Sequence, residues 1–471
     1  MDLRPTVGVG SGRWAVVVAM MAAAALLVGL AGTSSGAPAP TKRYIVVLKE
    51  TVADPAATAG AQARPTRSVV RNVFATAVKG YTADIPADSV ATVAGDPATQ
   101  FVTEDRPIKR PRERAPKQAP PTEPCNGNSV PGYFRSCWAL RVGADRSSAR
   151  SGDGQGTVNV RTAVVDDGID PNHPELNVVG GTDCLSGTAT GSQVVRGSHG
   201  TNVSGVLAAR DDEFGVVGIA PGAPLLGVSV FPESGDSDTS TILCALDWIT
   251  RTRLDRDRGN DIEIANLSLG DPELLDTPAC GIRDRDALHL AVCKAVASGV
   301  LIVASAGNET TGLRAPGTYP EVLTASAIGD YDGRPGAFDA RADCFGFPYH
   351  DIFGDNDDAA AYFSNFGTRP VDRLHTVAAP GACIVTTRPG TNAVLDIVDG
   401  TSFSAPIVSG TAAVCLSSGK CRRGNPLGTL ARLVTDANAY TLVDRRYGFA
   451  GDPVRPVPGR YYGPLVNVAR F

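Results

Sequence analysis

Apolar and polar segments alternate regularly along residues 137–416. Short runs rich in Val, Ile and Ala have the length of strands, and longer segments with a helical pattern separate them. The strand candidates are residues 158–165, 225–230, 262–268, 300–305 and 322–327. The helix candidates are residues 200–210, 240–253, 284–298 and 402–416. Because the strand candidates are apolar throughout, both faces of their sheet should be covered. The alternation predicts an α/β fold, with a parallel sheet and helices on both faces.

A smaller unit precedes this region, at residues 42–105. It contains an apolar run at 44–48, a mixed β-like stretch at 72–85, a possible short helix at 87–94 and a second β-like run at 100–102. We expect a small α+β domain here, with no internal repeat relating it to the larger one.

Residues 106–124 change character abruptly, because they are basic and rich in proline. Such a composition predicts an extended linker. An inert spacer would look the same. We favour a processing junction, because exposed extended chain is what proteases cut.

The first 37 residues have the pattern of a signal peptide. Arg4 and Arg13 precede an apolar run at 14–31, and small residues follow it. A retained membrane anchor is the alternative, since this run is near the lower length limit for a spanning helix. Export also fits the ten cysteines, which suggest disulfides. The short pairs Cys125–Cys137 and Cys415–Cys421 are the simplest expectation.

Composition narrows the function classes. The chain has 471 residues, 43% hydrophobic and 20% charged, which is ordinary for a globular protein. The net charge of −5 gives no reason to expect a nucleic-acid partner, because such proteins usually carry a basic face.

Residues of catalytic type occur at four positions. Asp166 ends an apolar strand, where open α/β folds place their sites. His199 and Ser402 each open a helix, and Pro406 lies in the first turn of the second. A helix N-terminus offers free N–H groups and a positive dipole end, which suit a developing oxyanion. Asn308 follows a buried strand and adds a side-chain donor. Taken alone, each residue also fits a cap, a turn or a core position.

Together these motifs resemble the subtilisin-like serine peptidase family, over roughly residues 137–416. The matching segments are 165–168 (Val-Asp-Asp-Gly), 199–201 (His-Gly-Thr), 305–308 (Ser-Ala-Gly-Asn) and 400–406 (Gly-Thr-Ser with a later Pro), supported by 218–221, 266–270 and 363–367. The resemblance implies that Ser402 attacks the scissile carbonyl and that His199 takes and returns the proton. Asp166 would orient His199, while Asn308 and the Ser402 backbone N–H would bind the oxyanion.

The resemblance also implies a substrate cleft. The edge that pairs with extended substrate would be Ser268, Leu269 and Gly270. The other wall of the main specificity pocket would be Ala304, Ser305, Ala306 and Gly307. The acids Glu309 and Asp271 would favour basic side chains near the rim. One residue departs from the family's sequence pattern. Asp167, which follows the candidate catalytic Asp166, replaces the family's usual Ser or Thr.

These expectations divide the chain into four parts. They are a signal peptide (1–37), an inhibitory propeptide (38–105), a basic processing linker (106–124) and a subtilisin-like catalytic domain (125–471). We expect a secreted, extracellular, monomeric endopeptidase that acts on proteins or peptides, processes itself and is inhibited by its own propeptide. Contact with a membrane would require retention of the N-terminal segment. The alternatives are a membrane-held maturation protease with a dedicated partner and a catalytically silent binding protein.

The chemistry of this family needs no cofactor, although structural calcium is possible at an unknown site. Residues 344–361 carry several acids, including Asp351, Asp355, Asp357 and Asp358. Clustered oxygen ligands of this kind bind calcium. Because the spacing matches no known metal loop, a solvated acidic loop is the preferred interpretation.

Overall fold

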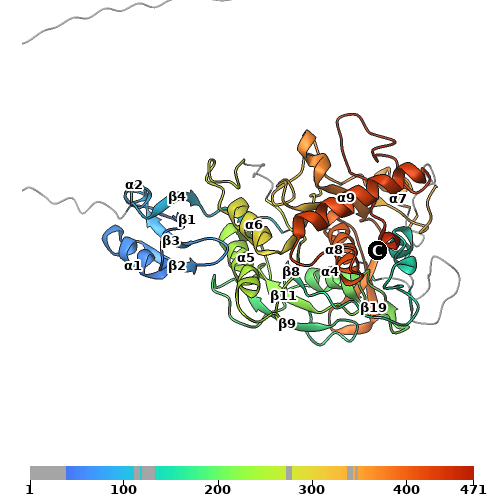
Figure 1. The fold of residues 1–471 in the computed structure, drawn as a ribbon, viewed down its shortest axis with the longest axis horizontal. Helices are drawn as coiled ribbons and strands as arrows, with labels where there is room; N and C mark the ends of the chain where they lie inside the picture. Colours follow the sequence, from blue (N-terminus) through green and yellow to red (C-terminus); the bar gives the residue numbers. More distant parts are fainter. Residues whose placement is uncertain are drawn as a thin grey trace, which may run out of the picture. The chain divides into compact units, whose positions relative to one another are not determined.

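The alternating apolar runs form one sheet in the computed structural model (Figure 1). The model describes residues 39–110, 117–118, 133–134, 136–271, 278–336, 343–344 and 348–471. Along the sheet the strand order is β16-β15-β14-β13-β8-β11-β9, and β17 pairs with β15. The bounds are β8 Thr162–Asp166, β9 Val178–Asp183, β11 Leu225–Ser229, β13 Ile264–Leu267, β14 Leu301–Ser305, β15 Leu323–Gly329, β16 Ala359–Ala360 and β17 Thr376–Pro380. All pairings are parallel except β15 with β16.

Helices cover both faces of this sheet, as the sequence predicted. One core contains side chains of α4 (His199–Ala208), α8 (Thr401–Ser417) and α9 (Pro426–Val443), and the other contains those of α5 (Thr239–Leu254) and α6 (Ala287–Ser298). Successive strand residues point to opposite faces. Val303 therefore packs in the first core, whereas Ile302 and Ala304 pack in the second. This alternation explains why the strands are apolar throughout.

The residues before the linker form a separate small sheet, with the strand order β2-β3-β1-β4 and antiparallel pairing. Its elements are β1 Thr41–Leu48, α1 Pro55–Thr66, β2 Val69–Phe74, β3 Gly80–Pro86, α2 Val90–Ala94 and β4 Thr99–Glu104. One face has its own core around Tyr81. The other face places Ile45, Val47 and Phe101 in the core that α5 and α6 share. We call residues 41–104 the amino-terminal sheet unit.

Short elements surround the central sheet. They are β5 Pro107–Ile108, β6 Lys117–Gln118, β7 Tyr133–Phe134, β10 Gly215–Val216, β12 Ser237–Asp238, β18 Ile384–Arg388, β19 Thr391–Val398, α3 Cys137–Arg141, α7 Tyr349–Phe353 and 3-10 turns at Ala144–Arg146, Pro370–Leu374 and Val468–Arg470. The pair of β5 with β12 matters for function, because it ties the start of the predicted linker to the large domain.

Disulfides bridge Cys184–Cys244, Cys280–Cys293, Cys344–Cys383 and Cys415–Cys421. The last of these confirms one of the two pairs expected from sequence. The other expected pair includes Cys125, which lies outside the described residues.

The expectation of a solvated acidic loop was wrong. Asp355, Asp357 and Asp358 are buried, and only Asp351 of the four named acids is exposed. Tyr331 and Tyr362 donate hydrogen bonds to Asp355, and the guanidinium of Arg141 lies 2.6 Å from Asp358. The acids are buried because these partners replace water.

Among the described residues, the sequence did not predict the short helices α3 and α7 or the longer helices α1 and α9. Helix α1 carries small and polar residues with little apolar periodicity, and α9 lies beyond the region of clear alternation. Among the described residues, no helix combines the length and apolarity needed to cross a membrane. The apolar run at 14–31 lies outside this description.

Candidate active site

The Asp–His pair lies at the carboxyl end of the central strands. Asp166 is the last residue of β8, and His199 is the first residue of α4. The Nδ1 atom of His199 lies 2.7 Å from Oδ1 of Asp166, and both side chains are buried. This contact fixes the orientation of the imidazole. Its other nitrogen, Nε2, is the atom that exchanges a proton with a nucleophile in such a pair. The ring of Phe403, next to Ser402 in sequence, stands edge-on to His199 with centroids 5.6 Å apart.

Ser402 is the second residue of α8, where backbone N–H groups have no partner within the helix. The turn before it requires glycine, because Gly400 has a φ of +147° and an added Cβ would lie 3.2 Å from the Asn308 amide nitrogen. Ser268 donates a hydrogen bond of 2.7 Å to the Ser402 carbonyl. Ser402 is 1% exposed, so its hydroxyl is shielded from solvent.

Asn308 lies beside this helix start, in the loop after β14. Its Oδ1 accepts hydrogen bonds from the Thr401 backbone N–H at 2.9 Å and the Thr401 hydroxyl at 2.8 Å. These bonds use the amide oxygen, so the N–H₂ end of Asn308 is directed elsewhere. The contact at Gly400 places that N–H₂ end close to the turn that precedes Ser402. An anion at this turn would meet donors from both a side chain and a helix N-terminus.

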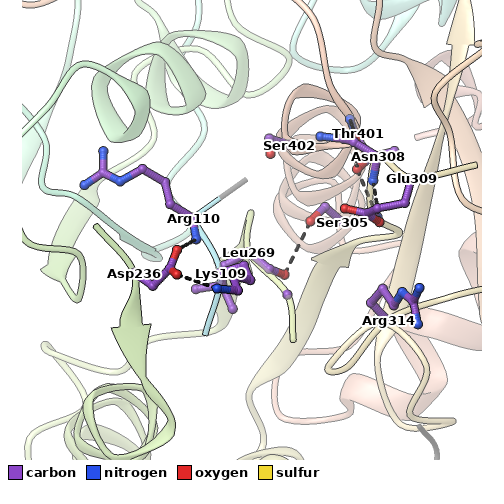
Figure 2. A pocket seen from close by; sticks show the side chains of 12 residues that line it. Lys109, Arg110, Asp236, Leu269, Ser305, Asn308, Glu309, Arg314, Thr401 and Ser402 are labelled. Carbon is purple, nitrogen blue, oxygen red and sulfur yellow. Dashed lines mark hydrogen bonds and ion pairs between the residues drawn. The ribbon is translucent and has the colours of Figure 1, made fainter. Parts of the chain in front are cut away.

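A cavity of about 460 Å³ opens in front of Ser402 (Figure 2). Four of the seven predicted substrate-binding residues line it, namely Leu269, Gly270, Ser305 and Gly307. The other three, Ser268, Ala304 and Ala306, are fully buried. The cavity is also lined by Lys109 and Arg110 of the predicted linker, by Thr401 of the Gly-Thr-Ser segment, and by Asp236 and Arg314, which the sequence did not single out.

Sequence reasoning missed a chain of buried hydrogen bonds behind the cleft. Ser409 donates to Asn266 Oδ1 at 2.9 Å, Asn266 donates to Ser268 Oγ at 2.9 Å, and Ser268 donates to the Ser402 carbonyl. The chain connects β13 to two turns of α8. The Asn266-Leu-Ser268 segment was noted only as part of a motif, and nothing local marks Ser409.

Asp167 is buried beside Asp166, with 1% of its side chain exposed. Its Oδ1 accepts a 2.8 Å hydrogen bond from the Gly200 N–H. Burial raises the pKa of Asp167 to about 6 and the charge of Asp166 adds to this, although His199, the Gly200 bond and Arg110 oppose the shift.

Calcium was left open by the sequence. Asp330, Asp332 and Asp357 place carboxylate oxygens within 4.8 Å of one another. However, the buried guanidinium of Arg141 lies 2.7 Å from Asp330, so an internal cation already balances part of this group. Of the acids named from sequence, only Asp357 belongs to it. The three acids are therefore not assigned as a calcium site, and the proposed chemistry uses no metal.

The chain is similar to well-known proteases. A model of the subtilase family matches residues 158–450. Subtilisin NAT of Bacillus subtilis subsp. natto is 32% identical over 264 residues, which are 55% of this chain and 56% of the relative. Subtilisin DY of Bacillus licheniformis is 30% identical over 281 residues, 59% of this chain and 82% of the relative. The match to subtilisin NAT thus spans little more than half of its length.

The fold is similar to that of a solved structure. Fervidolysin from Fervidobacterium pennivorans, described as a keratinolytic enzyme related to subtilisin, superposes with a TM-score of 0.60. The superposition covers 92% of this chain and 61% of that chain, at 19% sequence identity. At this identity the likeness supports the fold alone.

Proposed function

Since this chain belongs to the subtilase family, we propose that it is a secreted serine endopeptidase made as a self-processing precursor. The observation that carries the proposal is the 2.7 Å contact of His199 with Asp166, at the same end of the sheet as the start of α8 with Ser402. Open α/β folds have their sites at the carboxyl ends of the strands, where Asp166 lies, which supports the proposal.

The proposed chemistry is acyl transfer. Ser402 Oγ attacks the carbonyl carbon of the peptide bond while His199 removes its proton. Asp166 stabilises the imidazolium that forms. The developing oxyanion receives hydrogen bonds from the Asn308 amide and the Ser402 backbone N–H. His199 then protonates the leaving amine, and water releases the acyl group by the same steps in reverse.

The amino-terminal sheet unit supports the precursor part of the proposal. Asp247 of α5 accepts hydrogen bonds from the backbone N–H groups of residues 75–77, the shortest being 2.6 Å at Thr76. Asp105 accepts two more from Ser240, at 2.9 Å to the backbone N–H and 2.6 Å to the hydroxyl. A unit docked in this way, with the following chain in the cleft, would block substrate, which is the behaviour of an intramolecular inhibitor.

The test is mass spectrometry of the secreted wild type beside Ser402→Ala. We expect wild type to begin within about residues 106–125, and the variant to retain residues 42–105. Thr435→Ala, at an exposed position of helix α9, is the processing control and should mature like wild type. Identical cutting of wild type and Ser402→Ala would contradict self-processing, and an absence of protease activity in matured wild type would contradict the proposed function.

A further inference from the structure

The first residues of the predicted linker lie in the cleft as an extended strand. Ile108 pairs with Ser237, and Pro107 with Asp238, in antiparallel register. On the other side, Lys109 forms an antiparallel bridge with Gly270. Residues 107–110, which we call the cleft segment, are therefore bound between two backbone edges. This is how an extended peptide adds to an exposed strand.

The cleft segment runs toward the nucleophile. It passes β12 first and Gly270 next, and Arg110 then contacts Asp167, the neighbour of Asp166. Arg110 and Ser402 line the same cavity (Figure 2). The segment thus occupies the place of substrate residues on the acyl side of a scissile bond, with Arg110 closest to the triad.

Three groups contact the guanidinium of Arg110. Its Nη1 lies 3.2 Å from Oδ2 of Asp167, and its Nη2 donates a hydrogen bond of 2.5 Å to the Pro232 carbonyl. The guanidinium carbon also lies 5.3 Å from the centroid of the Phe231 ring. Two acceptors at fixed angles and an aromatic face suit a planar guanidinium better than the compact ammonium of lysine.

Other residues of the enzyme hold the groups around this guanidinium in place. The Gly200 N–H holds one oxygen of Asp167, which leaves the other to face Arg110. Gly197 keeps this space open, because a Cβ there would lie 2.0 Å from Asp167 Oδ2 and 3.2 Å from Arg110 Nη1. Asp167 is 1% exposed, so the ion pair is shielded from solvent on the enzyme side.

The preceding basic residue is held differently. Lys109 Nζ lies 2.7 Å from Asp236, but the two side chains are 54% and 36% exposed. Exposed ion pairs contribute little free energy. Glu309, one of the rim acids suggested by sequence, accepts hydrogen bonds from the Asn308 N–H and the Asn365 amide, and the contact of Lys109 is with Asp236. Selection for a basic substrate side chain should therefore be stronger at the Arg110 position than at the Lys109 position.

From these contacts we propose that Asp167, the Pro232 carbonyl and Phe231 form an arginine-selective subsite, and that the enzyme prefers protein segments with arginine at the Arg110 position. The buried Ile108 adds a preference for an aliphatic residue two positions earlier. The inference deepens the proposed function and rests on it. The cleft segment is then a copy of the preferred substrate, supplied by the chain itself.

The test compares quenched fluorescent peptides of the form Pro-Ile-Lys-Xaa-Ala-Ala-Gly, with Xaa as arginine, lysine or citrulline. Citrulline keeps the shape of arginine but not its charge. With the matured enzyme we expect kcat/KM for arginine to exceed that for citrulline about tenfold to a hundredfold, the range for hydrogen bonds to charged groups. Mass spectrometry would verify that the arginine peptide is cut at one bond on the C-terminal side of Xaa.

Asp167→Asn and Asp167→Ser should each reduce the arginine-to-citrulline ratio toward one. Glu233→Gln, which removes a carboxylate charge from an exposed position in the loop that carries Phe231 and Pro232, should leave the ratio unchanged. A wild type without arginine preference, or a preference that survives both Asp167 variants, would overturn the inference while the protease function stands. A wild type that cuts none of the peptides and no protein would overturn the proposed function itself.

Discussion

Single carboxylates carry much of the proposed preference for arginine. Asp167 was visible in the sequence only as a departure from the family pattern. In the structure its two oxygens have separate partners, the Gly200 N–H on one side and the Arg110 guanidinium on the other. Its neighbour Asp166 uses Oδ1 to hold His199. Adjacent acids thus serve two different tasks because the strand end directs them to opposite neighbours.

The arginine preference should depend on pH. The pKa of Asp167 is raised to about 6, mainly by burial and also by Asp166. The carboxylate that attracts arginine is therefore present above this pH and is lost as pH falls through it. We expect the arginine-to-citrulline ratio of kcat/KM to fall between pH 7.5 and 5. The citrulline peptide is the control, because groups that do not interact with the guanidinium affect both peptides alike. A ratio constant over this range would contradict the prediction.

The hydrogen-bond chain behind the nucleophile should contribute to both stability and activity. Asn266→Ala would leave the buried hydroxyls of Ser409 and Ser268 without their Asn266 contacts. Losing partners of buried polar groups costs about 1–3 kcal/mol each. We expect a free energy of unfolding lower by about 2 kcal/mol in urea titrations, together with a lower kcat. Asn260→Ala, near the surface, should change stability by less than about 0.5 kcal/mol. Equal effects of the two changes would argue against the chain.

At the scale of elements, a buried arginine joins segments far apart in sequence. Arg141, at the end of α3, lies 2.7 Å from Asp330 and 2.6 Å from Asp358. It also donates a 2.8 Å hydrogen bond to the Gly448 carbonyl. Three segments therefore meet at this side chain, namely the residue after β15, the acids at 355–358 and the chain after α9. The cost of burying several carboxylates is offset only while this cation is present.

Arg141→Met should accordingly be severely destabilising. Removing one partner of a buried ion pair typically costs about 3–5 kcal/mol, because the remaining charges are left uncompensated. The measurement is urea unfolding in the Ser402→Ala background, which prevents self-digestion. Arg146→Met is the matched control, since its contact with Asp145 is 3.6 Å long and its side chain is 58% exposed. A loss below about 1 kcal/mol for Arg141→Met would refute this role.

At the scale of the whole molecule, the amino-terminal sheet unit shares a core with α5 and α6, and Asp105, Asp238 and Asp247 lie near this contact. Burial raises the pKa of Asp105 to about 6, and Asp238 adds to the shift while Ser240 and Arg43 oppose it. The pKa values of Asp238 and Asp247 are also raised, mainly by burial. These groups favour the docked state most when they are protonated.

Docking of this unit should therefore weaken as pH rises. The contribution of Asp105 is fully present below its ordinary pKa and is lost as pH rises through about 6. Each unit of upward shift corresponds to about a tenfold change in the docking equilibrium. We expect the amides of residues 75–77, which bond to Asp247, to exchange hydrogen faster at pH 7.5 than at pH 5 in Ser402→Ala, after correction for intrinsic rates. Amides within β3 are the internal control. Equal protection at both pH values would exclude the effect.

The sequence by itself determined the α/β class, the main strands and helices, the family and the four candidate catalytic residues. It could do so because continuous apolar runs require a sheet covered on both faces, and because the motifs around Asp166, His199, Asn308 and Ser402 are local. Helix α1 escaped because its residues have little apolar periodicity, and the acids at 355–358 were misjudged because their cationic partner Arg141 lies more than 200 positions away.

Only the tertiary structure decided what the linker and the extra acid do. Nothing local indicates that Ile108 and Arg110 lie in the cleft, or that Asp167 faces a guanidinium instead of solvent. Those contacts join positions separated by 57 residues or more. They exist because strand pairing brings residues 107–110 between β12 and Gly270, so the specificity proposed here follows from folding and not from any single motif.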